Sequence, residues 1–340
     1  MKSEIPAKDR ILRQLAFLEE NRDKLVIDAD THATDTSSLN PELMRRYSTG
    51  ENYYHGRPVS AEDLLSEMNM AEVDMALIWQ NPAATPYSED PKKNFLALLE
   101  ANRYIYNSAV KYPEKFIPAG WTDPGSLGLI AAKELARICV NEYGFAIVKM
   151  NPAQNTYPID SNMVTEVVDY IVQLGAVPAF HFGADTKFTP AEGLAALAER
   201  HPDNPIIGVH MGGGGAAYPE AEELYTKARA LGLEHPNIKF VLSAKRDTHI
   251  ESDLITYTIS GEPFSSNLFC GSDAPYGRMT WNFGGYRSMF RSLLNGRGHT
   301  DSRVRTNQNL FTECMAQKYL GGNFAEFMIE AYRSLLQEEE

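Results

Sequence analysis

Short apolar segments alternate with longer amphipathic segments along most of the chain, and this alternation limits the folds that the sequence can adopt. The apolar segments lie at residues 25–30, 75–79, 116–121, 146–150, 177–181, 205–210, 238–242 and 268–273. Each is almost continuously apolar, which is typical of strands that are buried on both faces. Segments with helical periodicity separate them, at residues 60–71, 94–111, 126–142, 161–174, 190–200, 219–231 and about 249–260.

Eight strands that alternate with helices predict a parallel sheet, and this number of units allows the sheet to close into a (β/α)₈ barrel. An open, doubly wound sheet is the alternative architecture. The length of 340 residues suits a single barrel domain with insertions. We expect a leading helix over residues 1–24, the barrel over residues 25–330, and an insertion over residues 34–57 after the first strand.

The composition argues against nucleic acids and membranes as partners. The net charge is −13, and no basic run offers a surface for phosphates. No apolar stretch approaches the roughly 20 residues that a membrane span needs, and the N-terminus lacks the apolar segment of a secretion signal. The three cysteines, Cys139, Cys270 and Cys314, are too scattered for a disulfide framework and suit a reducing compartment. We therefore expect a cytoplasmic protein.

Several predicted strands end in a carboxylate or an imidazole. Asp30 and His32 stand two residues apart at the end of the first strand, so they point to the same side of an extended chain. His181 ends the fifth strand, His210 the sixth and Asp273 the eighth. In a (β/α)₈ barrel the carboxyl ends of the strands form one face, where catalytic groups gather. We therefore expect these side chains to converge.

Converging carboxylates and imidazoles are typical ligands for zinc, manganese or iron. Taken singly, a histidine at a strand end is more often a buried structural residue, and an aspartate before Ala-Pro is a common turn residue. Here, however, three of the eight histidines stand at three different strand ends, beside two aspartates. The set as a whole therefore predicts a metal centre.

Aromatic and basic residues near the strand ends are candidates for substrate binding. Trp79, Trp121 and Tyr276 lie close to strand ends and could pack against a planar substrate, or they could instead cap the core. Arg278 could bind a substrate carboxylate, although such an arginine is more often exposed to solvent.

The order of several short motifs resembles that of the amidohydrolase superfamily. The motifs are IDADTH at residues 27–32, GFAIVK at 144–149, FH at 180–181, VHMGGG at 209–214 and GSDAPYG at 271–277. The resemblance spans residues 25–330 and is closest to the branch that includes aminocarboxymuconate semialdehyde decarboxylase and the amidohydrolase-related metal-dependent hydrolases. It implies a TIM barrel with one divalent metal ion, zinc first and manganese or iron as alternatives. It also implies a homo-oligomer that acts on a small molecule.

The resemblance implies roles for the strand-end residues. Asp30, His32, His181 and Asp273 would hold the metal ion. Asp273 would also handle the proton of the reaction, and His210 would orient or polarise the substrate. The carboxylate of Asp30 departs from the His-x-His pattern that is usual in the superfamily, and it favours harder ions such as manganese or magnesium. Related decarboxylases that act on aromatic acids also place an acid at this position.

Lys149 ends the fourth predicted strand. Some members of the superfamily carry a carboxylated lysine at this place that bridges two metal ions. The branch that this chain resembles typically holds one metal ion. We therefore expect Lys149 to have a structural or substrate-orienting role.

Two reactions fit these residues. The preferred one is hydrolysis of a small-molecule lactone, ester or amide, in which Asp273 takes the proton of an activated water and His210 helps to polarise the carbonyl group. The alternative is non-oxidative decarboxylation of an aromatic or unsaturated carboxylic acid, with Asp273 as the proton donor to carbon. Hydration or other lyase chemistry, and a metal-binding protein without enzymatic activity, are further alternatives.

Overall fold

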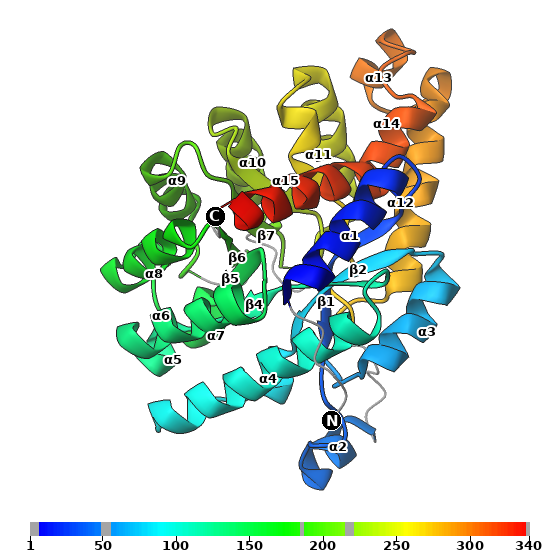
Figure 1. The fold of residues 1–340 in the computed structure, drawn as a ribbon. Coiled ribbons are helices and arrows are strands. Elements are labelled where there is room, and N and C mark those ends of the chain that lie inside the picture. The colour runs from blue at the N-terminus through cyan, green and yellow to red at the C-terminus, as the bar shows by residue number, and fades with distance from the viewer. Residues whose placement is uncertain (1–6, 49–55, 184–186, 215–220, 338–340) are drawn as a thin grey trace.

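The computed structural model describes residues 7–48, 56–183, 187–214 and 221–337 of the chain. Parallel strands surrounded by helices form its centre (Figure 1). The strands are β1 (Ile27–Ala33), β2 (Met75–Gln80), β3 (Phe116–Pro118), β4 (Gly120–Trp121), β5 (Ile147–Met150), β6 (Val177–Gly183), β7 (Ile206–Gly212), β8 (Ile238–Val241) and β9 (Leu268–Phe269). Each predicted strand is present, and the third is divided into β3 and β4.

The strand ladders fall into two parallel sheets, with the orders β1-β2-β3 and β4-β5-β6-β7-β8-β9. Backbone hydrogen bonds connect the two sheets on both sides. Ala119, between β3 and β4, donates to the carbonyl of Ile78 in β2 at 2.9 Å. On the other side, Ala29 of β1 donates to the carbonyl of Cys270, directly after β9, at 3.0 Å. The TIM-barrel prediction is therefore confirmed, and the seam of the barrel lies between β9 and β1.

The helices follow the predicted alternation. They are α1 (Ala7–Asn21), α2 (Pro41–Ser48), α3 (Ala61–Ala71), α4 (Pro91–Lys111), α5 (Pro124–Leu127), α6 (Leu129–Arg137), α7 (Pro152–Asn155), α8 (Asn162–Gln173), α9 (Ala191–Arg200), α10 (Ala221–Glu234), α11 (Asp247–Ser260), α12 (Met279–Leu294), α13 (Ser302–Thr306), α14 (Glu313–Gln317) and α15 (Asn323–Gln337). The insertion predicted at residues 34–57 contains α2, and its residues 49–55 lie outside the described part of the chain. Within the described residues, no helix has both the length and the apolar character that a membrane crossing requires.

The predicted helix over residues 126–142 is broken in the structure. α5 ends at Leu127. Gly128 follows with a φ of 78°, which lies in a region that favours glycine, and α6 begins directly after it. The last turn, Ile138–Glu142, is a π-helix. The sequence prediction missed these breaks because apolar periodicity continues across them.

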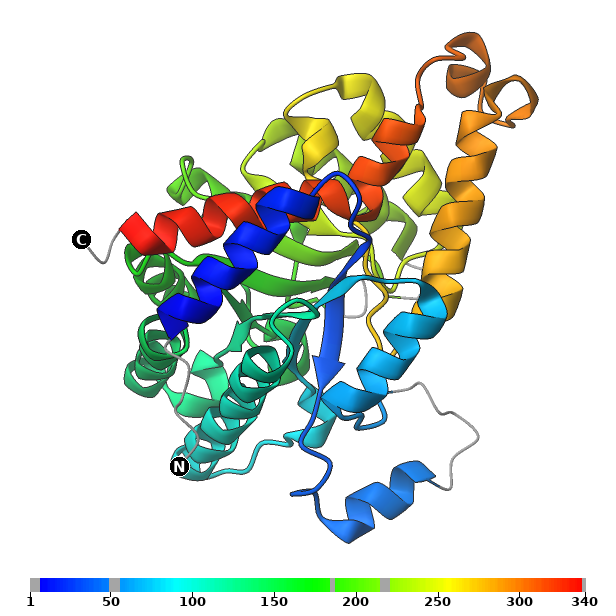
Figure 2. The ribbon, with the colours of Figure 1, turned by 45° about the vertical axis from the view of Figure 1, so that its right-hand side comes forward.

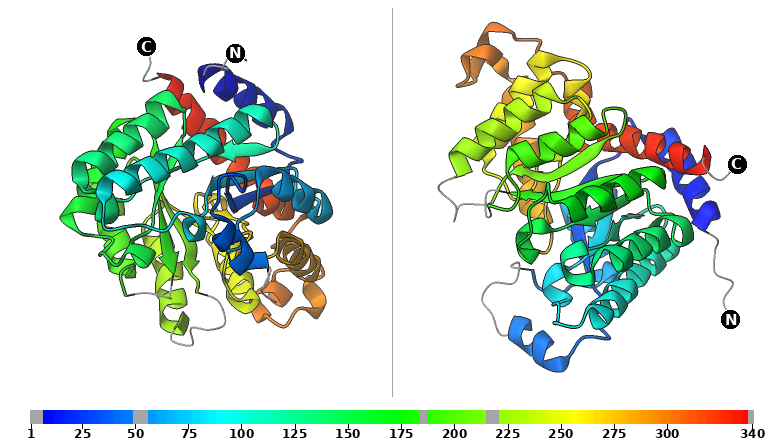
Figure 3. Two further views of the ribbon diagram at one scale, coloured as in Figure 1. Left: turned by 90° about the horizontal axis from the view of Figure 1, so that it is seen from below. Right: turned by 90° about the vertical axis from the view of Figure 1, so that its left-hand side faces the viewer.

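The two terminal helices cover the amino-terminal end of the barrel, where α1 packs against α15 (Figure 2). Gln14 of α1 donates to the carbonyls of Pro113 and Phe116 at the start of β3, and it accepts a hydrogen bond from Tyr332 of α15. The arrow of β1 in Figure 2 points away from these helices. The carboxyl ends of the strands therefore open on the opposite side, near α2, which Figure 3 (left) shows from below.

Candidate active site

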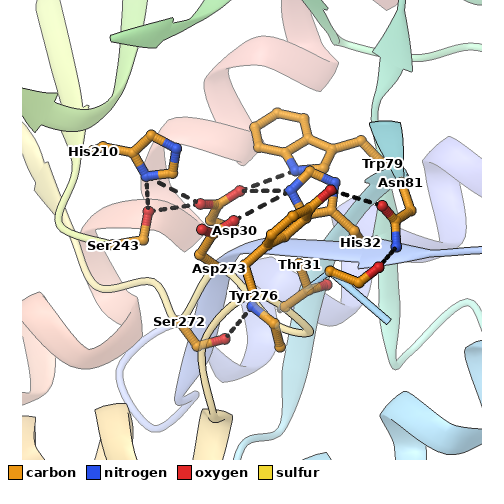
Figure 4. Close-up of polar contacts among 12 residues, drawn as sticks. Asp30, Thr31, His32, Trp79, Asn81, His210, Ser243, Ser272, Asp273 and Tyr276 are labelled. Carbon is orange, nitrogen blue, oxygen red and sulfur yellow. Dashed lines mark hydrogen bonds and ion pairs between the residues drawn. The ribbon is translucent and has the colours of Figure 1, made fainter. Parts of the chain in front are cut away.

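Two aspartates and a histidine converge at the seam of the barrel (Figure 4). Asp30 and His32 belong to β1, and Asp273 belongs to the segment after β9. His32 Nε2 lies 3.4 Å from Asp273 Oδ1 and 3.8 Å from Asp30 Oδ1. One possible ligand atom from each residue lies within 4.8 Å of the other two. We refer to Asp30, His32 and Asp273 as the ligand cluster.

The hydrogen bonds of His32 leave its second ring nitrogen available to a cation. Nδ1 lies 2.7 Å from the carbonyl oxygen of Gln80, and because a carbonyl only accepts, Nδ1 carries the proton. In the neutral ring, Nε2 then presents a lone pair toward the two carboxylates. Three electron-rich atoms that face one another repel unless a cation lies between them. Two carboxylate oxygens and one imidazole nitrogen fit zinc, manganese or iron.

Asp30 is fully buried and is held on both of its carboxylate oxygens. Trp79 Nε1 donates to Oδ1 at 3.0 Å, and Ser243 Oγ donates to Oδ2 at 2.6 Å. The Lys149 ammonium group lies 3.6 Å from Oδ1. Burial alone would raise the pKa of Asp30, but Lys149, with help from two imidazoles and Ser243, lowers it to about 2. Asp30 is therefore ionised at neutral pH.

A second buried aspartate, Asp28, fixes the seam next to the ligand cluster. It accepts hydrogen bonds from the backbone N–H of Ser272 at 2.9 Å, from the Ser272 hydroxyl, and from the backbone N–H of Asp30 at 3.1 Å. Burial raises the pKa of Asp28 well above its ordinary value, although these hydrogen bonds oppose the shift. Asp28 thereby links β1 to the residue that precedes Asp273.

A chain of hydrogen bonds fixes the tautomer of His210. Ser243 donates its proton to Asp30, so its oxygen accepts from His210 Nδ1, which lies 2.8 Å away. In the neutral ring, Nε2 then has no proton and can only accept a hydrogen bond. Burial lowers the pKa of His210 to about 4, against the opposing effect of Asp273, so the ring is neutral at pH 7. The ring of His181 packs edge-on against it, with 4.6 Å between the ring centres.

The backbone at both candidate catalytic residues lies in the left-handed region. φ is 79° at His210, 46° at Met211 and 58° at Asp273. Such angles are uncommon for residues other than glycine, and they gather at functional sites. Lys245 Nζ holds the first of these segments by donating to the Met211 carbonyl at 3.0 Å. A Cβ at Gly213 would lie 2.6 Å from a backbone oxygen of the neighbouring loop, so this close approach requires glycine.

The ligand cluster opens into a cavity of about 490 Å³ at the carboxyl face of the barrel. Its lining combines imidazoles, an ammonium group, a carboxylate and aromatic rings with amide and backbone groups. The lining residues are His32, Pro82, Ala83, Trp121, Lys149, Asn151, Ala153, Gln154, His181, His210, Gly213, Gly214, Ala244, Asp273 and Tyr276. A concave site of this size suits a small-molecule substrate.

Of the four metal ligands that the sequence predicts, three lie together and the fourth lies apart from them. Asp30, His32 and Asp273 form the ligand cluster. His181 lines the same cavity, but it does not belong to the three-residue cluster. Its role as a fourth ligand therefore stays a prediction.

The candidate substrate contacts also divide into two groups. Trp121 and Tyr276 line the cavity, whereas Trp79 and Arg278 are not among its lining residues. Trp79 is fully buried and contacts Asp30 through its indole nitrogen. Arg278 precedes α12, and its guanidinium carbon lies 4.7 Å from the centre of the Trp281 ring. The substrate-binding roles suggested for Trp79 and Arg278 therefore stay predictions, and the structure places both residues outside the cavity lining.

Tyr276 forms one side of the cavity. Its ring packs edge-on against His32, with 5.4 Å between the ring centres. Its hydroxyl group donates to Asn81 Oδ1 at 2.9 Å and accepts from the backbone N–H of Ala83 at 3.2 Å. A Cβ at Gly56 would lie only 2.4 Å from the Tyr276 ring, so the ring packs directly on the backbone there.

Sequence reasoning missed Ser243, Asn151 and Gln80. Ser243 follows the apolar segment 238–242, and Asn151 follows the segment 146–150, so the position directly after each strand is the signal that points to both. Their side chains, a hydroxyl and an amide, do not belong to the carboxylates and imidazoles that predict a metal centre. Gln80 acts through its backbone carbonyl, which no side-chain pattern reveals.

Known proteins share this fold. The family model described as Amidohydrolase matches residues 27–261. An uncharacterized TIM-barrel protein from Bordetella bronchiseptica superposes with a TM-score of 0.62 at 14% identity, over 91% of this chain and 99% of its own. A 5-carboxyvanillate decarboxylase from Novosphingobium aromaticivorans, solved with bound manganese and 3-methoxy-4-hydroxy-5-nitrobenzoic acid, gives 0.62 at 13% identity over 91% and 98%. A 4-oxalomesaconate hydratase from Rhodopseudomonas palustris gives 0.58 at 16% identity over 93% and 98%.

No curated protein matches this chain in sequence. At the low identities of the solved structures, the superpositions support the fold rather than a particular reaction. The family model covers more than half of the chain, from β1 to the end of α11, and the structure adds Asp273 beyond the matched region. This chain is therefore an enzyme of the amidohydrolase superfamily and belongs to its amidohydrolase-related, metal-dependent branch.

Proposed function

We propose that this enzyme is a metal-dependent carboxy-lyase that removes carbon dioxide from a small planar carboxylic acid with a neighbouring hydroxyl group. The observation that carries this proposal is the buried ammonium group of Lys149, which lies beside the ligand cluster among aromatic rings. Hydrolysis, which the sequence favoured, becomes the second candidate.

Lys149 gives the cavity a site for an anion. Among the described lining residues, it alone carries an ammonium or guanidinium group. Its Nζ lies 3.9 Å from the centre of the Trp79 ring and 5.3 Å from that of Trp121. A cation that is shielded from water attracts an anion strongly, and the flat Trp121 ring on the cavity wall favours a planar molecule. A planar carboxylate matches both features.

Asp30, His32 and Asp273 would hold the divalent metal ion, with His181 as the candidate fourth ligand. When bound, the ion would supply positive charge that binds substrate oxygen atoms and stabilises the negative charge that develops as carbon dioxide leaves. Two carboxylates in the cluster favour a hard ion, and manganese is bound in the similar decarboxylase structure. Manganese is therefore preferred here over zinc.

His210 would orient the substrate through Nε2. Because this nitrogen lacks a proton, it would accept a hydrogen bond from a substrate hydroxyl group and would not donate one to a carbonyl oxygen. This tautomer supports a hydroxylated acid, and it argues against the carbonyl polarisation that the sequence suggested for His210.

Asp273 would deliver the proton that replaces the carboxyl group. The bond between the carboxylate and the substrate carbon that carries it breaks, and carbon dioxide leaves. That carbon takes a proton from the Asp273 carboxyl group. Solvent then returns a proton to Asp273, whose side chain is 15% exposed. The reaction needs no oxidant or reductant.

Hydrolysis of a lactone, ester or amide is the second candidate, and the description of the matching family model favours it. Asp273 would then take a proton from the attacking water. The carbonyl oxygen would need a hydrogen-bond donor, which Lys149 or the side-chain amides of Asn151 and Gln154 in the lining could supply.

The deciding experiment measures whether the enzyme releases carbon dioxide from a carboxylic acid. Purified protein with added Mn²⁺ is incubated in D₂O with hydroxybenzoic acids that carry carbon-13 in the carboxyl group, and separately with lactones and esters. We expect labelled carbon dioxide and deuterium at the vacated carbon, with both lost in Asp273→Asn and retained in Asp203→Asn, which changes an exposed aspartate that does not line the cavity. Hydrolysis of lactones that depends on Asp273, with no carbon dioxide from any acid, would establish the hydrolase instead.

A further inference from the structure

A buried ion pair lies next to the segment that carries His210. The side chains of Lys245 and Asp253 are completely buried, and Lys245 Nζ lies 2.5 Å from Asp253 Oδ2. Neither residue lines the cavity, and neither belongs to the ligand cluster. Burial of an ion pair adds little net stability, because both charges lose their contact with water. One use of such a pair is to fix a particular arrangement of the chain.

The Lys245 ammonium group holds the backbone directly after His210. Its Nζ donates to the carbonyl of Met211 at 3.0 Å. His210 and Met211 are successive residues with left-handed backbone angles, and residues other than glycine keep such angles only where surrounding contacts hold them. An apolar side chain at position 245 could fill the same space, but it could not donate to the carbonyl.

Two residues after β8 contact this segment (Figure 4 shows the first of them). Ser243 Oγ lies 2.8 Å from His210 Nδ1 and fixes the ring, and Lys245 fixes the backbone that follows. The backbone N–H of Gly213 donates to the His210 carbonyl at 2.7 Å and closes the turn. If the Met211 carbonyl were released, the backbone could relax to ordinary angles, and the ring would move away from Ser243. The position of His210 Nε2 therefore depends on Lys245.

Two helices fix Lys245 in turn. Asp253 belongs to α11, and Arg229 of α10 donates through Nε to Asp253 Oδ1 at 2.5 Å. Because Asp253 binds both cations, it fixes the ammonium group relative to the helices outside the barrel. We propose that Lys245 and Asp253 are positioning residues that set the place of His210 Nε2, and that they thereby select substrates with a hydroxyl group that can donate to it. The selection of substrates rests on the proposed function, whereas the placement of His210 does not.

Hydrogen exchange, measured by mass spectrometry on the full-length protein, tests the placement of His210 without a substrate. In Lys245→Met, residues 210–214 should exchange roughly tenfold faster, because the Met211 carbonyl loses its donor, whereas β1 should keep its wild-type rate. Asp253→Asn should change the exchange in the same direction, and it serves if Lys245→Met does not fold.

Lys239→Met is the matched control for the exchange measurement. This lysine lies on β8 and donates to Asn267 at the other end of the strand, so its loss should leave residues 210–214 at the wild-type rate. Unchanged exchange at residues 210–214 in Lys245→Met, or an equal acceleration along the whole chain, would overturn the proposal.

Turnover tests the selection of substrates. With Mn²⁺ and a hydroxybenzoic acid that the wild type decarboxylates, Lys245→Met should lower kcat/KM by roughly tenfold or more and leave Mn²⁺ affinity close to that of the wild type. If Lys245 acts through His210, the same substitution should cost little further in a His210→Gln background. Losses that add in the double variant, or an equally large fall in Mn²⁺ affinity, would overturn the proposal. A wild type that releases no carbon dioxide would contradict the proposed function, and the exchange measurement would still decide the placement of His210.

Discussion

Asp30 carries a negative charge that its surroundings partly neutralise. Trp79 and Ser243 donate to its two oxygens, and the Lys149 ammonium group lies 3.6 Å from Oδ1. Lys149 therefore offsets one of the two carboxylate charges in the ligand cluster. A metal ion should bind less tightly to this cluster than to the same cluster without Lys149. Because less of its charge is neutralised, it should retain more of its attraction for substrate oxygen atoms.

Replacing Lys149 tests this balance of charge. At pH 8 we expect Lys149→Met to bind Mn²⁺ more tightly, on the order of tenfold, because the repulsion between the ion and the ammonium group is removed. The metal-free variant should lose roughly 3 kcal/mol of unfolding free energy, because Asp30 loses its ionic partner. Competition with a metal indicator and denaturant unfolding measure the two effects. Lys239→Met, at the start of β8, is the control, and a weaker Mn²⁺ affinity in Lys149→Met would contradict the argument.

At the scale of elements, short segments after the strands position the cavity wall. Asp123 follows β4 and caps α5 by accepting from the backbone N–H of Ser126 at 2.8 Å. It also accepts from the Tyr157 hydroxyl at 2.9 Å and from the side-chain amide of Asn155 at the end of α7. Because Ala153 of α7 lines the cavity, Asp123 connects two loops that shape the site.

The stability of the protein should report the ionisation of Asp123. Burial raises the pKa of Asp123 from 3.8 to about 6, although its hydrogen bonds oppose the shift. The folded chain then binds this proton more tightly than the unfolded chain, so the resulting stability is present below about pH 4 and is lost as the pH rises through about 6. Relative to Asp123→Asn, the wild type should lose about 2 kcal/mol of unfolding free energy between pH 4 and pH 7. Denaturant unfolding of both proteins across this range measures the difference, and a constant difference would contradict the prediction.

Two glycines should respond in opposite ways to a methyl group. In Gly213→Ala the new Cβ would lie 2.6 Å from the carbonyl oxygen of Ala244, and this backbone must shift to admit it. We expect a loss of roughly 1–3 kcal/mol in unfolding free energy, with reduced activity. Gly284 lies on the exposed face of α12 with nothing within 4 Å of a Cβ, so Gly284→Ala should stabilise by up to about 1 kcal/mol. Thermal unfolding of the two variants measures both effects. If Gly213→Ala proved more stable than Gly284→Ala, the close approach of the Ala244 carbonyl to Gly213 would not require glycine.

At the scale of the whole molecule, the ligand cluster spans the seam at which the barrel closes. Asp30 and His32 belong to the first strand, and Asp273 follows the last. The Asp28–Ser272 hydrogen bonds already join residues that are 244 positions apart in the sequence. A metal ion at the cluster would add a further link across the same seam.

Metal binding should therefore stabilise the folded barrel. At a free Mn²⁺ concentration one hundred times the dissociation constant, the unfolding free energy should rise by about 2.7 kcal/mol, and a chelator should reverse the gain. Asp30→Asn should remove most of this response because it deletes a ligand charge. Asp123→Asn, at another buried aspartate, should retain the response. If Mn²⁺ stabilised the wild type and Asp30→Asn equally, the ion would bind at a site other than the ligand cluster.

The sequence by itself determined the alternation of strands and helices and the residues that stand at the strand ends. These features are local, because a strand buried on both faces requires a continuous apolar run, and the polar residues begin where that burial ends. The divided third strand and the break at Gly128 escaped prediction, because they depend on backbone angles and pairing partners that periodicity does not specify.

Only the tertiary structure decided which strand-end residues meet. Closure of the barrel between β1 and β9 brings Asp30 and His32 to Asp273, whereas His181 stays on the cavity wall outside the cluster. The same closure brings Ser243 to Asp30, whereas the parallel pairing of β2 with β1 places Trp79 beside it. Apart from the two-residue spacing of Asp30 and His32, no spacing in the sequence relates these residues, because the distances between them are set by the strand order and register of the closed ring.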